Sequence, residues 1–264
     1  MPDSFRCSLN VAFHFPGATL AEALDGAVRA GFHTVELLDP YSIDLDDLEH
    51  ELGRRDLHLD LFNLPMGDFA AGDRGIAGDP ERVDEFRRGV ERAAAIAERL
   101  GVTKVNALAG RRIETLDREA QLHHLVEQLQ WAASVLDGVG VRVNTELLNP
   151  VESPGLLVAD LDSTLRLLER LDGRVGLQLD IYHLQRTHGE LLPTIAETAP
   201  VTGHIQIADA PRRTEPGSGE INFPNIFAAI AASGYDGLVG CEFRPSATDV
   251  DSFAWMDACG AIKT

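Results

Sequence analysis

The 264-residue sequence predicts a single (β/α)8 barrel, or TIM barrel, over residues 1–264. Segments typical of buried strands alternate with helical segments eight times, and the chain length is close to the roughly 250 residues that such a barrel takes. An open doubly wound sheet is the alternative, but no glycine-rich dinucleotide loop follows the first predicted strand. No linker rich in proline, glycine or serine divides the chain, so we expect one domain.

The predicted strands are short apolar runs, as expected for a parallel sheet whose two faces are covered by helices. They span residues 5–12, 33–38, 57–62, 103–108, 141–147, 175–180, 202–207 and 237–242. A helix is predicted after each strand, at residues 18–30, 44–53, 80–100, 115–137, 160–171, 188–198, 222–232 and 247–258.

The third helix shows the helical pattern best, because apolar residues recur at helical spacing between charged ones. These residues are Val83, Phe86, Val90, Ala94 and Ala97. Gly31 and Gly101 stand where the ends of helices favour a left-handed residue. Asp79 followed by Pro80 is typical of a helix start, with a capping side chain before a proline in the first turn.

The longest connection runs from Asn63 to Asp79 and contains four glycines. A loop of this length in a compact domain usually has a function or is disordered. Its glycines and the apolar Phe69 suit a lid over the barrel mouth, and an ordinary surface excursion is the alternative.

Each of four neighbouring predicted strands ends on a residue whose side chain offers an oxygen ligand. These residues are Glu146, Asp180, Gln206 and Glu242. Active sites of such barrels lie at the carboxyl ends of the strands, where three carboxylates would repel one another unless a cation lay between them. Oxygen ligands favour Mg²⁺ or Mn²⁺ over zinc or copper. Each residue alone has a structural alternative; Asp180, for example, can simply cap the helix that follows.

Further polar residues follow the same strands. His183 lies one helical turn past Asp180. The others are Asn149, Glu152, Arg186, Asp209, Arg212 and Arg244. Arginines at a metal-binding mouth suit a small carboxylate or phosphate substrate, which they bind through paired hydrogen bonds.

The composition excludes several classes of protein. The formal net charge of −19 argues against a nucleic-acid partner, which needs a cationic surface. The apolar runs are too short to span a membrane, and the first residues lack the features of a secretory signal. Cys7, Cys241 and Cys259 are scattered, which indicates neither disulfides nor a thiolate metal site. We therefore expect a cytoplasmic protein.

Six segments resemble the hydroxypyruvate isomerase family, within the xylose-isomerase-like barrels, and the resemblance extends along nearly the whole chain. They are residues 62–68, 70–77, 179–186, 203–209, 215–222 and 240–245. The resemblance implies an enzyme that interconverts hydroxypyruvate and tartronate semialdehyde through an enediolate. It also implies a divalent metal cofactor, Mg²⁺ or Mn²⁺, a small hydroxy-oxo acid as substrate, and a homo-oligomer as one expected state.

The resemblance also implies roles for individual residues. Glu146, Asp180, Gln206 and Glu242 match the family's metal ligands, and the two glutamates also match its acid/base carboxylates. Positions that contact substrate oxygens in related enzymes correspond to His183, Glu152 and Arg212. We expect Arg74, on the long loop, to hold the substrate carboxylate, and Arg244 to add positive charge at the rim.

The sequence departs from the family pattern around the substrate pocket, so alternatives stay open. Leu147 and Leu148 follow Glu146 where many relatives have Pro-Ile, Phe62 stands where some have histidine, and Arg244 replaces a common lysine. A 2-oxo-tetronate isomerase is the first alternative, and a ketose 3-epimerase, which usually has histidine at position 206, is the second. An endonuclease-IV-like enzyme would need more metal-binding histidines and a basic face. A non-catalytic binding protein would usually have lost a carboxylate.

Overall fold

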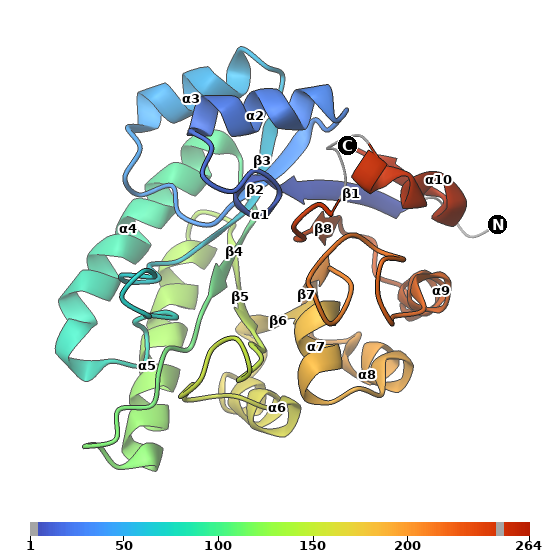
Figure 1. Ribbon diagram of the computed structural model, residues 1–264. Coiled ribbons are helices and arrows are strands. Elements are labelled where there is room, and N and C mark those ends of the chain that lie inside the picture. Colours follow the sequence, from blue (N-terminus) through green and yellow to red (C-terminus); the bar gives the residue numbers. More distant parts are fainter. Residues whose placement is uncertain (1–4, 247–250) are drawn as a thin grey trace.

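The computed structural model describes residues 5–246 and 251–264 (Figure 1). Within these residues, eight parallel strands pair in chain order and close into a barrel where β1 pairs with both β8 and β2. The strands are β1 (Phe5–Asn10), β2 (Thr34–Leu37), β3 (His58–Asn63), β4 (Lys104–Ala107), β5 (Arg142–Glu146), β6 (Val175–Asp180), β7 (Thr202–Ile207) and β8 (Val239–Cys241). The predicted (β/α)8 barrel is confirmed.

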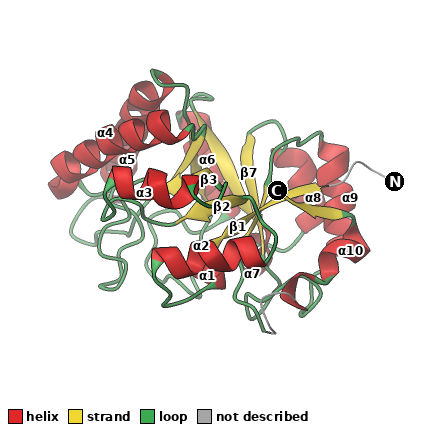
Figure 2. Cartoon of the chain, turned by 90° about the horizontal axis from the view of Figure 1, so that it is seen from above, coloured by secondary structure: helices red, strands yellow, loops and turns green. Residues whose placement is uncertain are grey.

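The helices lie around the barrel, as Figure 2 shows from above. The longer ones are α2 (Leu20–Arg29), α3 (Leu45–Gly53), α4 (Val83–Leu100), α5 (Arg118–Asp137), α6 (Leu161–Arg170), α8 (Leu191–Thr198) and α9 (Phe223–Ser233). Two short 3-10 helices, η1 (Pro80–Arg82) and η2 (Asp251–Phe253), precede α4 and α10 (Trp255–Cys259). Residues 247–250 of the last predicted helix lie outside the described residues. In the described part of the chain, no helix has the length and apolar character to cross a membrane.

Two short helices and a strand were not predicted. Helix α1 (Val11–His14) begins directly after β1, because the side chain of Asn10 accepts a hydrogen bond from the backbone N–H of Phe13. Helix α7 (Ile181–Thr187) follows β6 in the same way. Strand β9 (Ala261–Lys263) pairs in parallel with the first residues of β1, Phe5 to Cys7.

The apolar core lies between the strands and the helices. Side chains alternate between the two faces of a strand, and in β6 Leu177 and Leu179 belong to this core. The alternate residues, Gln178 and Asp180, face the barrel interior. Polar residues with at most 8% exposure repeat this pattern in the other strands, namely Ser8, Asn10, Glu36, Asn63, Asn106, Asn144, Glu146, His204, Gln206 and Glu242. The interior of the barrel is therefore lined by polar side chains, and this lining is accessible at the carboxyl end of the barrel.

The long connection between β3 and η1 packs against the end of β4. Gly75 has a φ of +94°, and a Cβ there would lie 2.0 Å from the backbone oxygen of Leu108, so only glycine fits this close approach. Phe69 is 45% exposed, and the guanidinium carbon of Arg74 lies 3.8 Å from the centre of its ring. The loop thus carries an aromatic side chain and an arginine beside the mouth of the barrel.

Candidate active site

A cavity of about 440 Å³ opens at the carboxyl end of the barrel. Six of the residues predicted from the sequence line it, which are Arg74, Glu146, Glu152, His183, Glu242 and Arg244. Apolar side chains from the loops complete its wall, among them Phe13, Met66 and Leu148. The cavity thus combines a charged floor with an apolar rim, as binding sites for small polar molecules often do.

The carboxyl group of Glu146 is held through one of its two oxygens. Its Oε2 accepts hydrogen bonds from Asn106 Nδ2 at 2.8 Å and from Gln178 Nε2 at 3.1 Å. Its Oε1 lies 3.8 Å from His183 Nε2. The amide donors therefore fix the carboxyl plane, and the other oxygen faces the neighbouring polar groups of the mouth.

Glu242 is held in a similar way from the other side. Its Oε1 accepts from Asn10 Nδ2 at 2.9 Å and from Gln206 Nε2 at 3.3 Å. Its Oε2 contacts Arg213 Nη2. Each of the two glutamates thus has one oxygen that is tied by side-chain amides.

The two carboxylate oxygens of Asp180 have different surroundings, and one of them caps a helix as the sequence suggested. Its Oδ1 accepts from the backbone N–H groups of Tyr182 at 2.7 Å and His183 at 3.2 Å, which starts helix α7. Its Oδ2 lies 3.3 Å from Arg213 Nη2 and 3.7 Å from His183 Nε2. The cap orients the carboxyl group so that its second oxygen faces the site.

Arg213 is the site residue that sequence reasoning missed. Its side chain is 8% exposed and forms ion pairs with Asp180, Glu242 and Glu152. It also stacks on Phe13, at 4.2 Å from the ring centre. Arg213 and its three acidic partners thus lie beside the aromatic ring of Phe13 at the mouth of the barrel.

The adjacent Arg212, which the sequence predicted as a substrate contact, is exposed and is absent from the described lining of the cavity. The turn of the chain explains the difference. Asp209 accepts backbone N–H groups of Gly217 and Gly219, which folds the loop back on itself, and Arg213 has a φ of 58°. The left-handed conformation of Arg213, the second arginine of the pair, reverses the direction of the chain and turns its side chain inward.

His183 is neutral and carries its proton on Nε2. Its Nδ1 accepts a hydrogen bond from the backbone N–H of Asn149 at 3.1 Å, and a backbone amide can only donate. Burial, and then the charge of Arg213, lowers the pKa of His183 well below its usual value. His183 therefore directs its Nε2–H group, a hydrogen-bond donor, toward Glu146 and Asp180.

The carboxyl groups of the site hold protons more tightly than usual. Burial, followed by repulsion from Glu242 and Asp180, raises the pKa of Glu146 well above its usual value. Burial also raises the pKa of Glu242 to about 8 and that of Asp180 to about 6, although Arg213 opposes both shifts. The site therefore concentrates negative charge beyond what Arg213 neutralises.

Glu152 and Gln206 complete the set of predicted residues. Glu152 accepts a hydrogen bond from the hydroxyl of Tyr182, and burial together with this bond raises the pKa of Tyr182 to about 12. Gln206 is 1% exposed and lies beneath the cavity beside Glu242. At the rim, Arg74 Nε donates to Ser153 Oγ at 3.0 Å, and the guanidinium carbon of Arg244 lies 5.7 Å from the ring centre of Phe13.

A divalent cation fits the chemistry of this donor set. Ligand atoms of Glu146, Asp180 and His183 lie within 4.8 Å of one another. The raised pKa values report the repulsion that a divalent cation would relieve. Because His183 presents an N–H group, the oxygens of Glu146, Asp180, Gln206 and Glu242 suit the ion better, and oxygen ligands suit Mg²⁺ or Mn²⁺.

Comparisons with known proteins agree with this architecture. The sequence model of the family described as xylose isomerase-like TIM barrel matches residues 24–259. A protein of Escherichia coli named hydroxypyruvate isomerase is 40% identical over 254 residues, which cover 96% of this chain and 98% of that protein. A 2-oxo-tetronate isomerase of Pectobacterium atrosepticum is 32% identical, with 96% and 97% covered.

A solved structure from Brucella melitensis, described as an AP endonuclease of family 2, superimposes with a TM-score of 0.90. It is 36% identical to this chain and covers 98% of it, and the match spans 99% of the Brucella chain. The matches in sequence and in structure therefore extend over almost the whole barrel. The chain belongs to the hydroxypyruvate isomerase family of the xylose isomerase-like TIM barrels.

Proposed function

We propose that the protein is a metal-dependent isomerase that interconverts hydroxypyruvate and tartronate semialdehyde. The observation that carries the proposal is the pair of buried glutamates, Glu146 and Glu242, which are each tied through one oxygen and line the same cavity. Their raised pKa values suit groups that take and return protons near neutral pH. The name of the 40% identical relative supports this substrate class.

The two glutamates would divide the proton transfers between them. One removes a proton from C3 of hydroxypyruvate, and the electron pair of that C–H bond forms the double bond of an enediolate between C3 and C2. The other returns a proton to C2, while the hydroxyl proton of O3 passes to O2 and leaves an aldehyde at C3. Oxidation of C3 balances reduction of C2, so the reaction needs no external oxidant. Glu146 ends β5 and Glu242 directly follows β8, so the two carboxyl groups approach the cavity from non-adjacent strands and would act on different carbons of the substrate.

Glu146, Asp180, Gln206 and Glu242 would hold the metal ion, for the reasons of charge and ligand chemistry given above. When bound, a divalent ion supplies Lewis acidity that polarises the substrate carbonyl and stabilises the negative charge that develops on its oxygen. The Nε2–H group of His183 would donate to a substrate oxygen from the same side.

The arginines of the mouth would have two separate tasks. Arg213 is engaged by Asp180 and Glu242, so it organises the carboxyl groups. Arg74 and Arg244 line the outer part of the cavity, where their guanidinium groups suit the carboxylate of a hydroxy-oxo acid. Arg74, held by Ser153 and stacked on Phe69, would bring the long loop over the bound substrate.

A 2-oxo-tetronate isomerase is the second candidate. The cavity of about 440 Å³ has room for a sugar acid with one more carbon beside a metal ion. The 32% identical relative with that name supports this possibility. A nuclease activity is not favoured, because the net charge of −19 would repel a phosphate backbone.

Assays of the purified protein on both acids test the proposal. We expect turnover of hydroxypyruvate that disappears with EDTA and returns with added Mg²⁺ or Mn²⁺, because proton removal needs the polarised carbonyl. Proton NMR in deuterated solvent would follow both the product and the exchange of the C3 proton. Turnover of 2-oxo-tetronate alone would select the second candidate, and full activity in EDTA would contradict the proposed metal chemistry.

The metal-free protein should lose stability as the pH rises from about 6.5 to 8. A group whose pKa is higher in the folded state stabilises the fold fully below its unfolded pKa and loses this contribution as the pH rises through its folded pKa. For Glu242 that window runs from 4.5 to about 8, and Glu146 acts in the same direction. His183 acts in the opposite direction, but only below its usual pKa of 6.5.

Thermal unfolding in EDTA measures this effect, and Glu242→Gln is the control because it removes one of the titrating groups. The unfolding temperature of the parent should fall across the window more steeply than that of the variant. Added Mn²⁺ should stabilise the parent more at pH 8 than at pH 6.5, since ligands must lose their protons to bind. A parent profile that is flat or rises between pH 6.5 and 8 would show that these carboxyl groups are not protonated in the folded state.

A further inference from the structure

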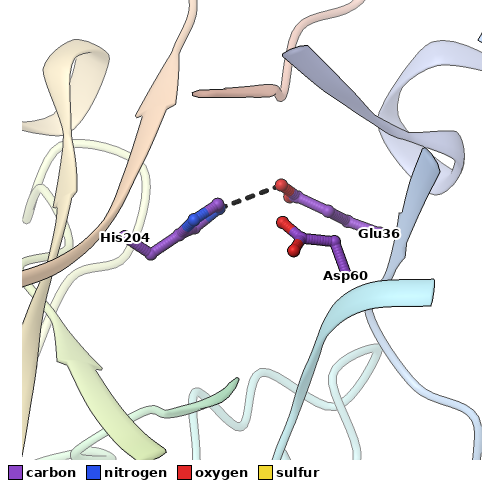
Figure 3. Close-up of side chains that lie close together, drawn as sticks. All are labelled: Glu36, Asp60 and His204. Atoms are coloured by element: carbon purple, nitrogen blue, oxygen red, sulfur yellow. Dashed lines mark hydrogen bonds and ion pairs between the residues drawn. The ribbon is translucent and has the colours of Figure 1, made fainter. Parts of the chain in front are cut away.

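A second polar cluster lies inside the barrel, beneath the site (Figure 3). Glu36 of β2, Asp60 of β3 and His204 of β7 have ligand atoms within 4.8 Å of one another. Figure 3 shows Glu36 and His204 extending toward each other from separate strands, with Asp60 below Glu36. His204 Nε2 lies 2.9 Å from Glu36 Oε1.

Partners from within the chain engage Glu36 through both carboxylate oxygens and Asp60 through one. Lys104 Nζ lies 2.7 Å from Asp60 Oδ1. Glu36 Oε1 accepts from Ser8 Oγ at 2.6 Å as well as contacting His204, and Glu36 Oε2 accepts from Gln206 Nε2 at 2.7 Å. Three donors around one carboxyl group identify it as an ionised acceptor. The geometry therefore favours a supporting role for Glu36 over that of a metal ligand.

The contacts of Gln206 show which group Glu36 supports, namely the side-chain amide of Gln206. A primary amide has two N–H protons and one oxygen, and its two ends look alike in shape. Nε2 of Gln206 faces two carboxylate oxygens, one of Glu36 at 2.7 Å and one of Glu242 at 3.3 Å. Both can only accept, so they take both protons of the amide. The oxygen of Gln206 must therefore face the opposite side, where Gln178 Nε2 donates to it at 2.7 Å.

We propose that Glu36 is a positioning residue: it takes the NH₂ group of Gln206 and so leaves the amide oxygen, on the side of Gln178 and Glu146, as the atom available to the metal ion. The inference rests on the proposed metal chemistry, in which Gln206 is a ligand. The effect extends to a catalytic glutamate, because Gln178 also donates to Glu146 Oε2 at 3.1 Å. A chain of oriented amides thus connects Glu36 to the carboxyl groups of Glu242 and Glu146.

The variant Glu36→Gln tests the proposal with almost no change in shape. Ser8 and His204 both donate to the position of Oε1, so the new amide oxygen stays there and the new NH₂ group replaces Oε2. That NH₂ group would face the NH₂ group of Gln206, and Gln206 would have to turn round. We expect the dissociation constant for Mn²⁺, measured by titration in an EPR spectrometer, to rise about 10–100-fold, as for other residues that orient a metal ligand.

Asp60→Asn is the matched control, because it also changes an acid of the same cluster, here a half-buried one, to its amide. The hydrogen-bond partner of Asp60 is Lys104 and not Gln206, so the Mn²⁺ affinity of this variant should stay within about twofold of the parent, although Lys104 loses its partner. Equal affinities for Glu36→Gln and the parent would overturn the proposal, as would an equal loss in Asp60→Asn. A parent that binds no Mn²⁺ would instead refute the proposed metal chemistry, and this inference with it.

A crystal structure of the Mn²⁺-loaded parent gives a second test that requires no variant to fold. The Gln206 atom that contacts the ion and the atom that contacts Glu36 should be different atoms. If one atom makes both contacts, or if Gln206 swings away from Glu36 when the ion binds, Glu36 does not set the orientation of the amide.

Discussion

Replacing Glu146 or Glu242 by glutamine is expected to slow the isomerisation of hydroxypyruvate by about 10²–10⁴-fold, the usual effect of losing a positioned base. Glutamine keeps an oxygen that can accept from the amides that hold each side chain, Asn106 and Gln178 for Glu146, and Asn10 for Glu242. It cannot accept a proton from carbon. Each variant should therefore fold, while exchange of the substrate C–H proton with deuterated solvent falls by a similar factor.

Asp180→Asn separates metal binding from proton transfer. The side-chain oxygen of the new asparagine can still cap α7, but the side chain no longer presents a negative charge to the site. We expect weaker binding of Mn²⁺ and partial recovery of activity at high Mg²⁺ or Mn²⁺. The glutamine variants should show no such recovery. Near-parental isomerisation by both glutamine variants would rule out the two-glutamate mechanism.

Replacing Arg213 by methionine should lower the free energy of unfolding by about 3–5 kcal/mol, the range found when one partner of a buried ion pair is removed. Arg213 is 8% exposed and pairs with Asp180 and Glu242, whose carboxyl groups would be left close together without it. Methionine keeps apolar contact with Phe13, so the loss reports mainly on charge. Added Mn²⁺ should restore more stability in this variant than in the parent, since the ion neutralises the same carboxyl groups.

Arg212→Met is the matched control for this prediction. Arg212 is exposed, and surface substitutions usually change stability by no more than about 0.5 kcal/mol. Urea denaturation of the parent and of both variants, in EDTA and in Mn²⁺, makes the comparison. Equal stabilities of the two variants would mean that Arg213 does not neutralise the site as its contacts indicate.

The fold and the strand-end residues could be predicted because both depend on local patterns. Buried strands and amphipathic helices follow from the order of apolar residues, and the carboxyl end of each strand faces the mouth in any parallel barrel. Glu146, His183 and Glu242 line the cavity for this reason. Helix α7 was not predicted as an element, although Asp180 was named as the cap of a following helix, because the predicted helix began only at residue 188.

Other parts of the site depend on where the chain turns and on contacts across the barrel. Arg212 and Arg213 differ only in the direction of their side chains, which a left-handed turn decides and composition does not reveal. Glu36 and His204 are 168 residues apart and meet through the barrel interior. No pattern within β2 or β7 indicates that contact. The residues that support Gln206 from below are therefore visible only in the three-dimensional structure.

The polar lining of the barrel separates the part that holds the fold together from the part that carries the chemistry. The described apolar core lies outside the strands, where Leu177, Leu179 and their neighbours pack against helices. Exchanging a side chain of the lining, such as Gln178 or Asn106, removes no methyl group from that core. Its cost lies instead in the hydrogen bonds that the new residue must satisfy. Such a protein can acquire new specificity without disturbing its apolar packing, provided that each new polar group finds hydrogen-bond partners.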